Sequence, residues 1–444
     1  MTPIRPNPTP TSLRVGMVME ELASAGGIEE ALVTLAEALR PLGVTSVVLS
    51  CRPLAPDNQY ARRLRAAGVP LTSLPRGYTF ARDHEARLGA WAATIVLLVV
   101  WPLTLMGLAG LMLLRRRGLA AAWRSLRGAV QARLPVRGLV RHAWAAALRG
   151  WARREQLDLL HVHGYGGGAS PAGSLAAAAT TNLPLVYSEH GIPWPSLRAE
   201  AELHAHLARA ERLIAVSHAA ARALRELCAA RQPIDVIYHV VPDAPAAVER
   251  PTPPGQLVFG CAAMLRPPKG HRYWLASMPA VLGEIPGSRF VLAGDGSERA
   301  ALEQQAAGLG VAGQVTFAGQ VPNPALRRML SQEWSVFVLP SVEEPLGVVV
   351  VEAMAAALPI VATRAGGVLD LVRDEETALL VPPGDSAALA AAQIRLARDP
   401  ALRQRLGAAA RAAYLQGGFS PAAIGQATLS VYRAALAAHQ SPAA

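Results

Sequence analysis

The sequence predicts an α/β protein with two domains, each built on a parallel sheet covered by helices. Short runs rich in β-branched residues alternate along the chain with Ala- and Leu-rich amphipathic stretches, which is typical of this class. The alternation occurs twice, and a segment rich in Pro and Ala without periodicity, residues 241–255, separates the two halves. A chain of 444 residues is long enough to form two full cores.

The strands can be placed by their apolar runs. They are expected near Leu13, Val44, Leu71, Leu159, Leu185, Leu213 and Val236 in the first half, and near Val258, Phe290, Val315, Val336, Ile360 and Leu379 in the second. We therefore divide the chain into a loose tail (1–12), an N-terminal domain (13–248), a linker (249–256), a C-terminal domain (257–414) and a C-terminal helix that returns to the N-terminal domain (415–444). The tail is rich in Pro and Thr and is not expected to be a secretory signal.

An uncharged stretch of the N-terminal domain, residues 90–114, is long enough to be a membrane-spanning helix, for which about 20 residues suffice. Strands of one domain lie on both sides of it, however, and a single crossing would split that domain between compartments. Pro102 at its midpoint cannot donate to a helix ladder. We expect a re-entrant pair of short helices inserted into the membrane; an ordinary buried core helix is the alternative.

The net charge of +11 is confined to one segment that follows this stretch. Eleven arginines and no acidic residue lie between Arg115 and Arg154, and the remaining 32 basic residues balance the 32 acidic residues of the chain. Apolar residues recur between the arginines at helical spacing; they are Trp123, Leu126, Val130 and Leu134, then Val140, Trp144, Ala147 and Trp151. This pattern predicts basic amphipathic helices on an anionic membrane surface rather than nucleic-acid binding, so residues 88–154 form the expected membrane segment.

The cysteines and histidines predict neither a disulfide nor a metal site. Cys51, Cys228 and Cys261 lie far apart without paired spacing, which fits a reducing cytoplasm. His161 and His163 point to one face of a strand, but no third metal ligand accompanies them. No Asp-x-Asp occurs, so we expect no metal and no other cofactor.

The most informative basic residue is Lys269, the single lysine among the 43 basic residues of the chain. It follows an apolar run, residues 257–265, that predicts a buried strand. A chain that uses arginine everywhere else indicates that this position needs a compact ammonium on a flexible stem, which suits a phosphate oxygen. Arg266 lies three residues before it.

Two glutamates and several glycine pairs add to this site. Glu344 is expected on a loop and Glu352 in the helix that follows, where their carboxylates can accept hydrogen bonds from sugar hydroxyls. Gly26-Gly27 precedes a helix and would let a phosphate approach the helix N-terminus closely. Gly294-Asp295-Gly296 and Gly366-Gly367 also follow strands, where ligands of parallel sheets bind.

Taken together, these residues resemble family 4 glycosyltransferases, which have the GT-B architecture of two facing Rossmann-like domains. The motifs that carry the resemblance are Arg266-x-x-Lys269-Gly270, Gly294-Asp295-Gly296, Val315-Thr316-Phe317-Ala318-Gly319, Phe337-Val338-Leu339-Pro340-Ser341, Glu344 through Glu352-Ala353-Met354, Pro359-Ile360-Val361-Ala362-Thr363 and Gly366-Gly367. N-terminal counterparts are Gly26-Gly27-Ile28-Glu29, His161-Val162-His163-Gly164, Ser188-Glu189-His190-Gly191 and Ala215-Val216-Ser217.

The resemblance implies transfer of one sugar from a nucleoside-diphosphate donor with retention of anomeric configuration. It gives the site residues these roles: Arg266 and Lys269 hold the diphosphate, Glu352 binds the ribose hydroxyls, Glu344 and the backbone amides near Leu346 and Gly347 position the donor sugar, and His190 lies near sugar and acceptor. Gly26 and Gly27 join the donor-binding set. The N-terminal domain would be the acceptor side and the C-terminal domain the donor side.

Some positions depart from the family pattern. His239-Val240 stands where an Asn-Gly pair is common, Ala357 replaces a frequent glycine, Asp370 replaces a common glutamate, and Trp334-Ser335 replaces an Ala-Asp pair. With the membrane segment, the resemblance predicts a monotopic glycosyltransferase on the cytoplasmic face of the cell membrane, acting on a lipid-linked acceptor. A sugar-nucleotide epimerase of the same fold and a catalytically silent membrane scaffold are the alternatives.

Overall fold

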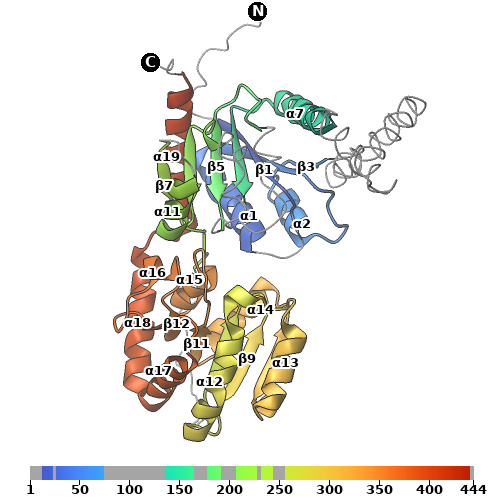
Figure 1. The fold of residues 1–444 in the computed structure, drawn as a ribbon. Coiled ribbons are helices and arrows are strands. Elements are labelled where there is room, and N and C mark those ends of the chain that lie inside the picture. Colours follow the sequence, from blue (N-terminus) through green and yellow to red (C-terminus); the bar gives the residue numbers. More distant parts are fainter. Residues whose placement is uncertain are drawn as a thin grey trace, which may run out of the picture.

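The computed structural model describes residues 13–23, 27–74, 136–164, 178–191, 207–227, 232–243 and 256–440 (Figure 1). The tail, the hydrophobic stretch 90–114, the arginines before residue 136, Gly26 and nearly all of the linker lie outside these residues, and the predictions made for them stay predictions. Among the helices in the described ranges, none combines the length and the apolar character that a membrane crossing requires.

The N-terminal domain is built on a seven-stranded sheet with the order β3-β2-β1-β4-β5-β6-β7 among the described residues. All its neighbouring strands are parallel. The strands are β1 (Leu13–Met19), β2 (Val44–Ser50), β3 (Leu71–Ser73), β4 (Leu159–Gly164), β5 (Leu185–Glu189), β6 (Arg212–Ala215) and β7 (Ile234–Val236). The predicted strand positions are confirmed. Their near-continuous apolar character follows from burial on both faces.

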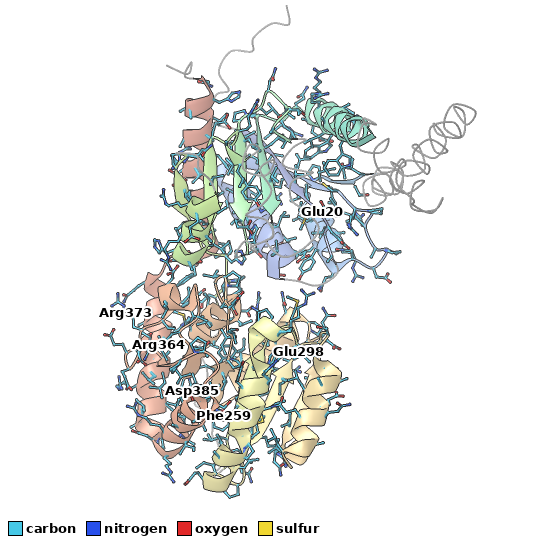
Figure 2. The ribbon with its side chains drawn as sticks, in the orientation of Figure 1. Glu20, Phe259, Glu298, Arg364, Arg373 and Asp385 are labelled. Carbon is cyan, nitrogen blue, oxygen red and sulfur yellow. The ribbon has the colours of Figure 1, made fainter. Side chains whose placement is uncertain are left out.

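The C-terminal domain is built on a second sheet, whose six described strands have the order β10-β9-β8-β11-β12-β13 and are again parallel. The strands are β8 (Val258–Ala262), β9 (Arg289–Ala293), β10 (Val315–Gly319), β11 (Val336–Leu339), β12 (Ile360–Thr363) and β13 (Leu379–Val381). Phe259 on β8 lies inside this domain and Arg373 at its outer edge (Figure 2). The prediction of two parallel-sheet α/β domains is confirmed.

Helices cover both sheets. In the N-terminal domain they are α1 (Gly27–Leu39), the short η1 (Arg40–Leu42), α2 (Gln59–Ala66), α7 (Val136–Arg154) and α11 (His218–Leu227). In the C-terminal domain they are η2 (Pro267–Lys269), α12 (His271–Glu284), α13 (Arg299–Gly308), η3 (Ala312–Gln314), α14 (Asn323–Arg328), η4 (Met329–Glu333), α15 (Val348–Ala355), α16 (Val368–Leu371), α17 (Ser386–Arg398) and α18 (Pro400–Gln416). Asn58, Asp385 and Asp399 cap α2, α17 and α18 with their side chains.

Helix α7 corrects part of the membrane prediction. Trp144 and Trp151 were expected to face lipid, and this expectation is wrong, because both side chains are buried in the hydrophobic core of the N-terminal domain. Gly16 on β1 makes this packing possible, since a Cβ there would lie 2.9 Å from the Trp151 ring. One face of the parallel sheet needs an apolar cover, and the stripe of tryptophans on α7 provides it.

The last helix, α19 (Pro421–Gln440), lies against the N-terminal domain although it follows the C-terminal domain in sequence (Figure 1). It packs on α1, β5 and β6. Gly425 allows the close approach, because a Cβ there would lie 2.9 Å from the carbonyl oxygen of Ala38. The chain therefore passes between the domains more than once.

Candidate functional site

The carboxyl ends of the two sheets meet where the domains touch. The Ser217 hydroxyl, after β6, donates to the carbonyl oxygen of Pro345 across 2.6 Å. The backbone N–H of His218, at the start of α11, donates to the Asp370 carboxylate across 2.6 Å. Ligands of open parallel sheets bind beyond the carboxyl ends of the strands. This junction is therefore the expected position of a ligand site.

The segment after β8 carries the two predicted cations. It forms the single turn η2 and ends at Gly270, which has φ of 67°. A Cβ on Gly270 would lie 2.0 Å from the carbonyl oxygen of Pro340, so only glycine allows this contact with the loop after β11. The N–H of Val342 on that loop donates to the carbonyl of Pro268 across 2.8 Å. The loops after β8 and β11 are thus fixed to each other.

Lys269 and Glu344 form an ion pair across these two loops. The Lys269 ammonium donates to Oε1 and Oε2 of Glu344, at 2.9 and 2.8 Å. The Glu344 side chain is almost fully buried, whereas that of Lys269 is 20% exposed. Ser341 Oγ donates to the same carboxylate across 2.9 Å. The predicted phosphate ligand and the predicted sugar ligand are therefore in direct contact.

Arg266 lies on the same loop but is held differently. It stands at the N-cap of η2 with extended backbone, its side chain is exposed, and no described residue forms an ion pair or hydrogen bond with its guanidinium. Its charge is therefore not neutralised by a neighbour in the described parts of the chain. A diphosphate that approached Lys269 would meet, on the same loop, a guanidinium that no described residue pairs.

The backbone between Glu344 and α15 is tightly shaped. Leu346 is buried, and Gly347 has φ of 90° at the N-cap of α15, a conformation that glycine adopts without strain. Gly367 at the start of α16 donates its N–H to the carbonyl of Glu344, and a Cβ there would lie 2.3 Å from the carbonyl of Pro345. These glycines let the start of α15 and the start of α16 lie close to Glu344.

Glu352 lies in α15, as predicted, and has an unusual protonation equilibrium. Its half-buried side chain loses water, which raises the pKa of the carboxyl from 4.5 to about 7. The nearby guanidinium of Arg327 on α14 opposes this shift, and the carboxylate of Glu30 adds to it. Perturbed carboxyls of this kind are concentrated at functional sites.

Glu30 connects the N-terminal domain to the part of the site around Glu352. It lies in the first turn of α1, where one carboxylate oxygen accepts from Arg63 across 2.6 Å. Its other oxygen accepts from the Asn323 side chain of the C-terminal domain across 2.8 Å. Glu30 therefore bridges the domains beside Glu352.

Gly27 is the exposed first residue of α1, and its partner in the predicted pair, Gly26, lies outside the described residues. A Cβ on Gly27 would meet no described atom within 4 Å, and its φ is not positive. The local fold therefore does not require glycine here. Open space at a helix N-terminus is what the close approach of a ligand requires.

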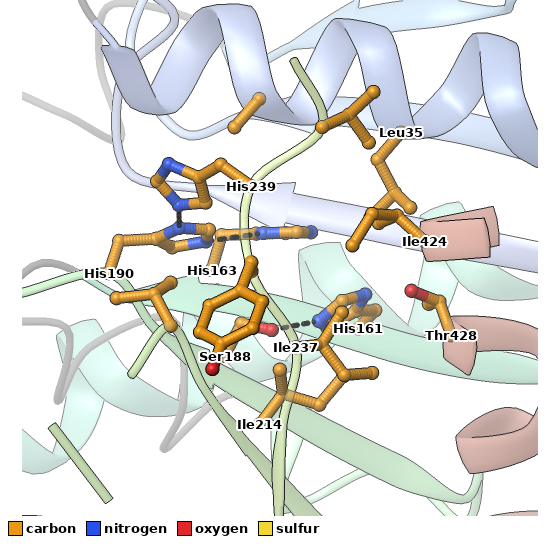
Figure 3. A pocket seen from close by; sticks show the side chains of 14 residues that line it. Leu35, His161, His163, Ser188, His190, Ile214, Ile237, His239, Ile424 and Thr428 are labelled. Atoms are coloured by element: carbon orange, nitrogen blue, oxygen red, sulfur yellow. Dashed lines mark hydrogen bonds between the residues drawn. The ribbon is translucent and has the colours of Figure 1, made fainter. Parts of the chain in front are cut away.

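His190 follows β5 and is buried. Its Nε2 is 2.9 Å from Nδ1 of His163, and its Nδ1 is 2.7 Å from Nε2 of His239 (Figure 3). In this structure, both ring nitrogens of the predicted catalytic histidine are thus bonded to other histidines. Burial and the neighbouring rings hold the pKa of His190 well below its usual range, so the ring is neutral near pH 7.

Within the described ranges, no three His, Cys, Asp or Glu side chains are arranged to hold a metal ion. His161 instead bonds to Tyr432 and Ser188, at 2.8 and 2.7 Å. Both of its ring nitrogens are therefore used within the fold.

Several residues of the site were not predicted. They are Ser341 beside Glu344, the bridge between Glu30 and Asn323, Arg327 near Glu352, and His163 and His239 on either side of His190. Ser341 and His239 could have been found from their positions just after β11 and β7. The bridge between Glu30 and Asn323 joins residues 293 positions apart, and a single sequence carries no signal for such a pair.

Two family models match the chain. Residues 247–413 match the family model described as "Glycosyl transferases group 1", and residues 116–244 match the one described as "Glycosyltransferase Family 4". The HepE protein of Anabaena in complex with UDP-glucose superimposes with a TM-score of 0.65 at 20% identity, covering 94% of this chain and 99% of that one. This likeness shows the shared fold.

Similarity to curated relatives shows which family the chain belongs to. The glycogen synthase of Mycobacterium tuberculosis is 34% identical over 199 residues, which are 45% of this chain and 47% of that protein, so the match spans about half of this relative. The D-inositol 3-phosphate glycosyltransferase of Acidothermus cellulolyticus is 32% identical over 336 residues, covering 67% of this chain and 72% of the relative. With the ion pair between the two loops and the fold of two parallel-sheet domains, these matches place the chain in the group 1 branch of the family 4 glycosyltransferases.

Proposed function

We propose that this protein transfers one sugar from a nucleoside-diphosphate donor, with retention of configuration and without a metal ion, to a lipid-linked acceptor at the cytoplasmic face of the cell membrane. The observation that carries the donor part is the ion pair between Lys269 and Glu344, at the carboxyl ends of β8 and β11. Arg266, on the same loop, supplies a second positive charge.

These groups suit the chemistry of the bond that breaks. When the anomeric carbon separates from the diphosphate, negative charge develops on the departing oxygen. The Lys269 ammonium has three N–H groups, two of which point to Glu344, so one remains for a phosphate oxygen. Arg266 can add a bidentate contact to the second phosphate. Lys269, fixed before the donor arrives, and Arg266 on the same loop can together stabilise the leaving group.

The acidic groups suit the rest of the donor. Glu344 is held by Lys269 and Ser341, which leaves its orientation fixed for hydroxyls of the sugar. Glu352 lies one helical turn into α15, where an ionised carboxylate can accept from both ribose hydroxyls. The N–H groups around Leu346 and Gly347 complete the polar surface for the sugar.

The acceptor is inferred from the sequence of the N-terminal domain. A 25-residue uncharged stretch followed by eleven arginines without an acidic residue favours an anionic membrane surface. Family membership does not choose the acceptor, because the relatives include, by name, both a D-inositol 3-phosphate glycosyltransferase and a lipopolysaccharide core biosynthesis glycosyltransferase. The uncharged stretch and the arginines after it therefore favour a lipid-linked acceptor.

A transfer assay with the purified full-length protein tests the proposal. UDP and GDP sugars are offered with EDTA present, together with a membrane lipid extract or a set of soluble sugars. The proposal expects transfer to the lipid fraction with retained configuration. Transfer to soluble sugars alone would refute the acceptor, and conversion of the donor to its epimer without transfer would refute the reaction.

A further inference from the structure

Three histidines form a buried row at the carboxyl ends of β4, β5 and β7 in the N-terminal domain (Figure 3). His190 is the middle ring, and His163 and His239 bond to its two nitrogens at 2.9 and 2.7 Å. The rings lie beside a cavity of about 30 Å³ that Leu35 and Ile424 also line.

The row links the proton positions of its members. Burial lowers the pKa of all three rings, so they are neutral near pH 7. A neutral imidazole has one N–H donor and one bare nitrogen acceptor. His190 must therefore donate through one nitrogen and accept through the other, and both bonds run in the same direction along the row. The tautomer of His239 consequently determines the tautomer of His190.

No other described side chain bonds to the His190 ring. The outer nitrogens of the row, Nε2 of His163 and Nδ1 of His239, have no hydrogen-bond partner within the described residues. Loss of His239 would leave His190 with one bond, to His163, and its Nδ1 without a partner. The ring could then rotate or change tautomer.

His239 is itself held in place by the C-terminal domain. It lies two residues before Val241, whose carbonyl accepts from the Tyr414 hydroxyl across 2.9 Å and whose N–H donates to the carbonyl of Phe419 across 3.2 Å. Tyr414 belongs to α18 and Phe419 to the connection before α19. The segment that carries His239 is thus anchored outside the sheet on which His190 lies.

We propose that His239 is a positioning residue for sugar transfer, which holds the ring plane of His190 and couples the tautomer of His190 to its own. This inference rests on the proposed function, because His190 gains its place near sugar and acceptor from that function. His239 acts through His190 and is not itself a catalytic residue.

Kinetics of three variants separate positioning from packing. His239→Ala removes the partner of His190. His239→Gln restores an amide that can reach the Nε2 position and either donate or accept. His161→Ala is the control, because this ring, on β4, is also buried but bonds to Ser188 and Tyr432 and not to His190. Circular dichroism selects a temperature at which every variant is folded.

The inference expects His239→Ala to lower kcat about 10-fold or more, with donor KM within about twofold, and His239→Gln to return kcat to within about threefold of the unmodified chain. His161→Ala should leave kcat within about twofold. Equal losses in His239→Ala and His161→Ala, or no rescue by glutamine, would overturn the positioning role.

A second readout does not depend on activity. Proton–nitrogen correlation spectra of ¹⁵N-histidine-labelled protein report the tautomer of each ring. Because the bonds of the row run in one direction, His163, His190 and His239 are expected to share the same tautomer in the unmodified chain and in His161→Ala, whereas the tautomer of His190 should change or become a mixture in His239→Ala. Unchanged His190 signals in His239→Ala would overturn the inference. If the unmodified protein transferred no sugar, the proposed function would fail, and these spectra alone would decide whether His239 fixes the ring.

Discussion

The ammonium of Lys269 lies 2.8 and 2.9 Å from the two carboxylate oxygens of Glu344, and the two residues come from loops that follow different strands of one sheet. Because the single lysine is fixed by a buried acid, its charge is already positioned when a donor arrives. The pair as a whole is nearly neutral, so the net attraction for a diphosphate rests on Arg266 and on the remaining N–H of Lys269.

Removal of Lys269 should affect both activity and stability. Lys269→Ala leaves the buried carboxylate of Glu344 with Ser341 as its remaining side-chain donor in the described structure, which should cost about 1–3 kcal/mol of unfolding free energy. Transfer should fall at least about 100-fold, since one stabilising donor at a developing charge is worth about that much. Urea unfolding and initial transfer rates measure the two effects.

The double variant Lys269→Met with Glu344→Gln is the control for stability. It removes both charges while keeping similar volumes, so unfolding free energy should recover to within about 1 kcal/mol of the unmodified chain, and activity should stay absent. A double variant as unstable as Lys269→Ala would contradict the role of the pair in stability, and one as active as the unmodified chain would contradict its role in transfer.

Donor affinity should depend on the ionisation of Glu352. Its pKa of about 7 means that the carboxyl is half protonated near neutral pH, and only the ionised form accepts from both ribose hydroxyls. Affinity for UDP or GDP should therefore weaken as pH falls, by up to about 10-fold one unit below the pKa. Calorimetry between pH 6 and about 8 measures this.

Two variants check the cause. Glu352→Gln should bind weakly and lose the pH dependence in this range. Glu30→Gln removes the negative charge that helps to raise the pKa of Glu352, so the midpoint of the affinity profile should move to lower pH. A flat profile in the unmodified chain would contradict the role of Glu352.

Substitution of Gly27 by alanine should weaken substrate binding without destabilising the fold. Because a Cβ would meet no described atom within 4 Å, Gly27→Ala should leave stability unchanged or raise it by about 0.5–1 kcal/mol through the better helix propensity of alanine. If phosphate approaches the start of α1, the added methyl group should weaken substrate binding about 10-fold or more. KM values equal to those of the unmodified chain would contradict the assignment of Gly27 to the donor-binding site.

The buried histidines should make the protein sensitive to acid. Burial lowers the pKa of His161 to about 3 and that of His239 to about 4, against 6.5 in the unfolded chain. Below pH 6.5 the histidines of the unfolded chain become protonated, whereas the buried rings of the folded protein stay neutral. The free energy of unfolding is therefore at its full value above about pH 6.5 and falls as the pH drops toward 4. Each such histidine contributes a slope of up to about 1.4 kcal/mol per pH unit.

The slope is testable by removing one titrating ring. His161→Asn should be less stable at pH 7.5 than the unmodified chain, through lost bonds to Ser188 and Tyr432, but its stability should fall less steeply with acid. Urea unfolding at several values between pH 4.5 and about 7.5 measures both. If the free energy of unfolding fell equally steeply with acid in both proteins, the His161 ring would not be held neutral in the folded state.

The fold could be predicted because the burial of each strand in the folded domain leaves a pattern in the local sequence. Strands such as β4 and β11 are buried on both faces, which produces continuous apolar runs that a sequence shows directly. Lys269, Glu344 and Glu352 were found because they lie just beyond strands or in the first helix after one, where chain order alone places a residue near the site.

Other features depend on contacts that the local sequence does not encode. The stripe of Trp144 and Trp151 suits a membrane surface and a sheet face equally well, and packing against β1 decides between them. Pairs such as Glu30 with Asn323, and His190 with His239, join distant segments, so their geometry appears only when the domains are assembled.

The most direct test of the donor site is calorimetric binding of UDP and GDP, without metal, to the unmodified chain and to Lys269→Ala held at a temperature where both are folded. The account predicts that one of the nucleotides binds the unmodified chain and binds Lys269→Ala at least about 10-fold more weakly, the effect of losing one charge-assisted phosphate contact. Equal affinity for both proteins would contradict it.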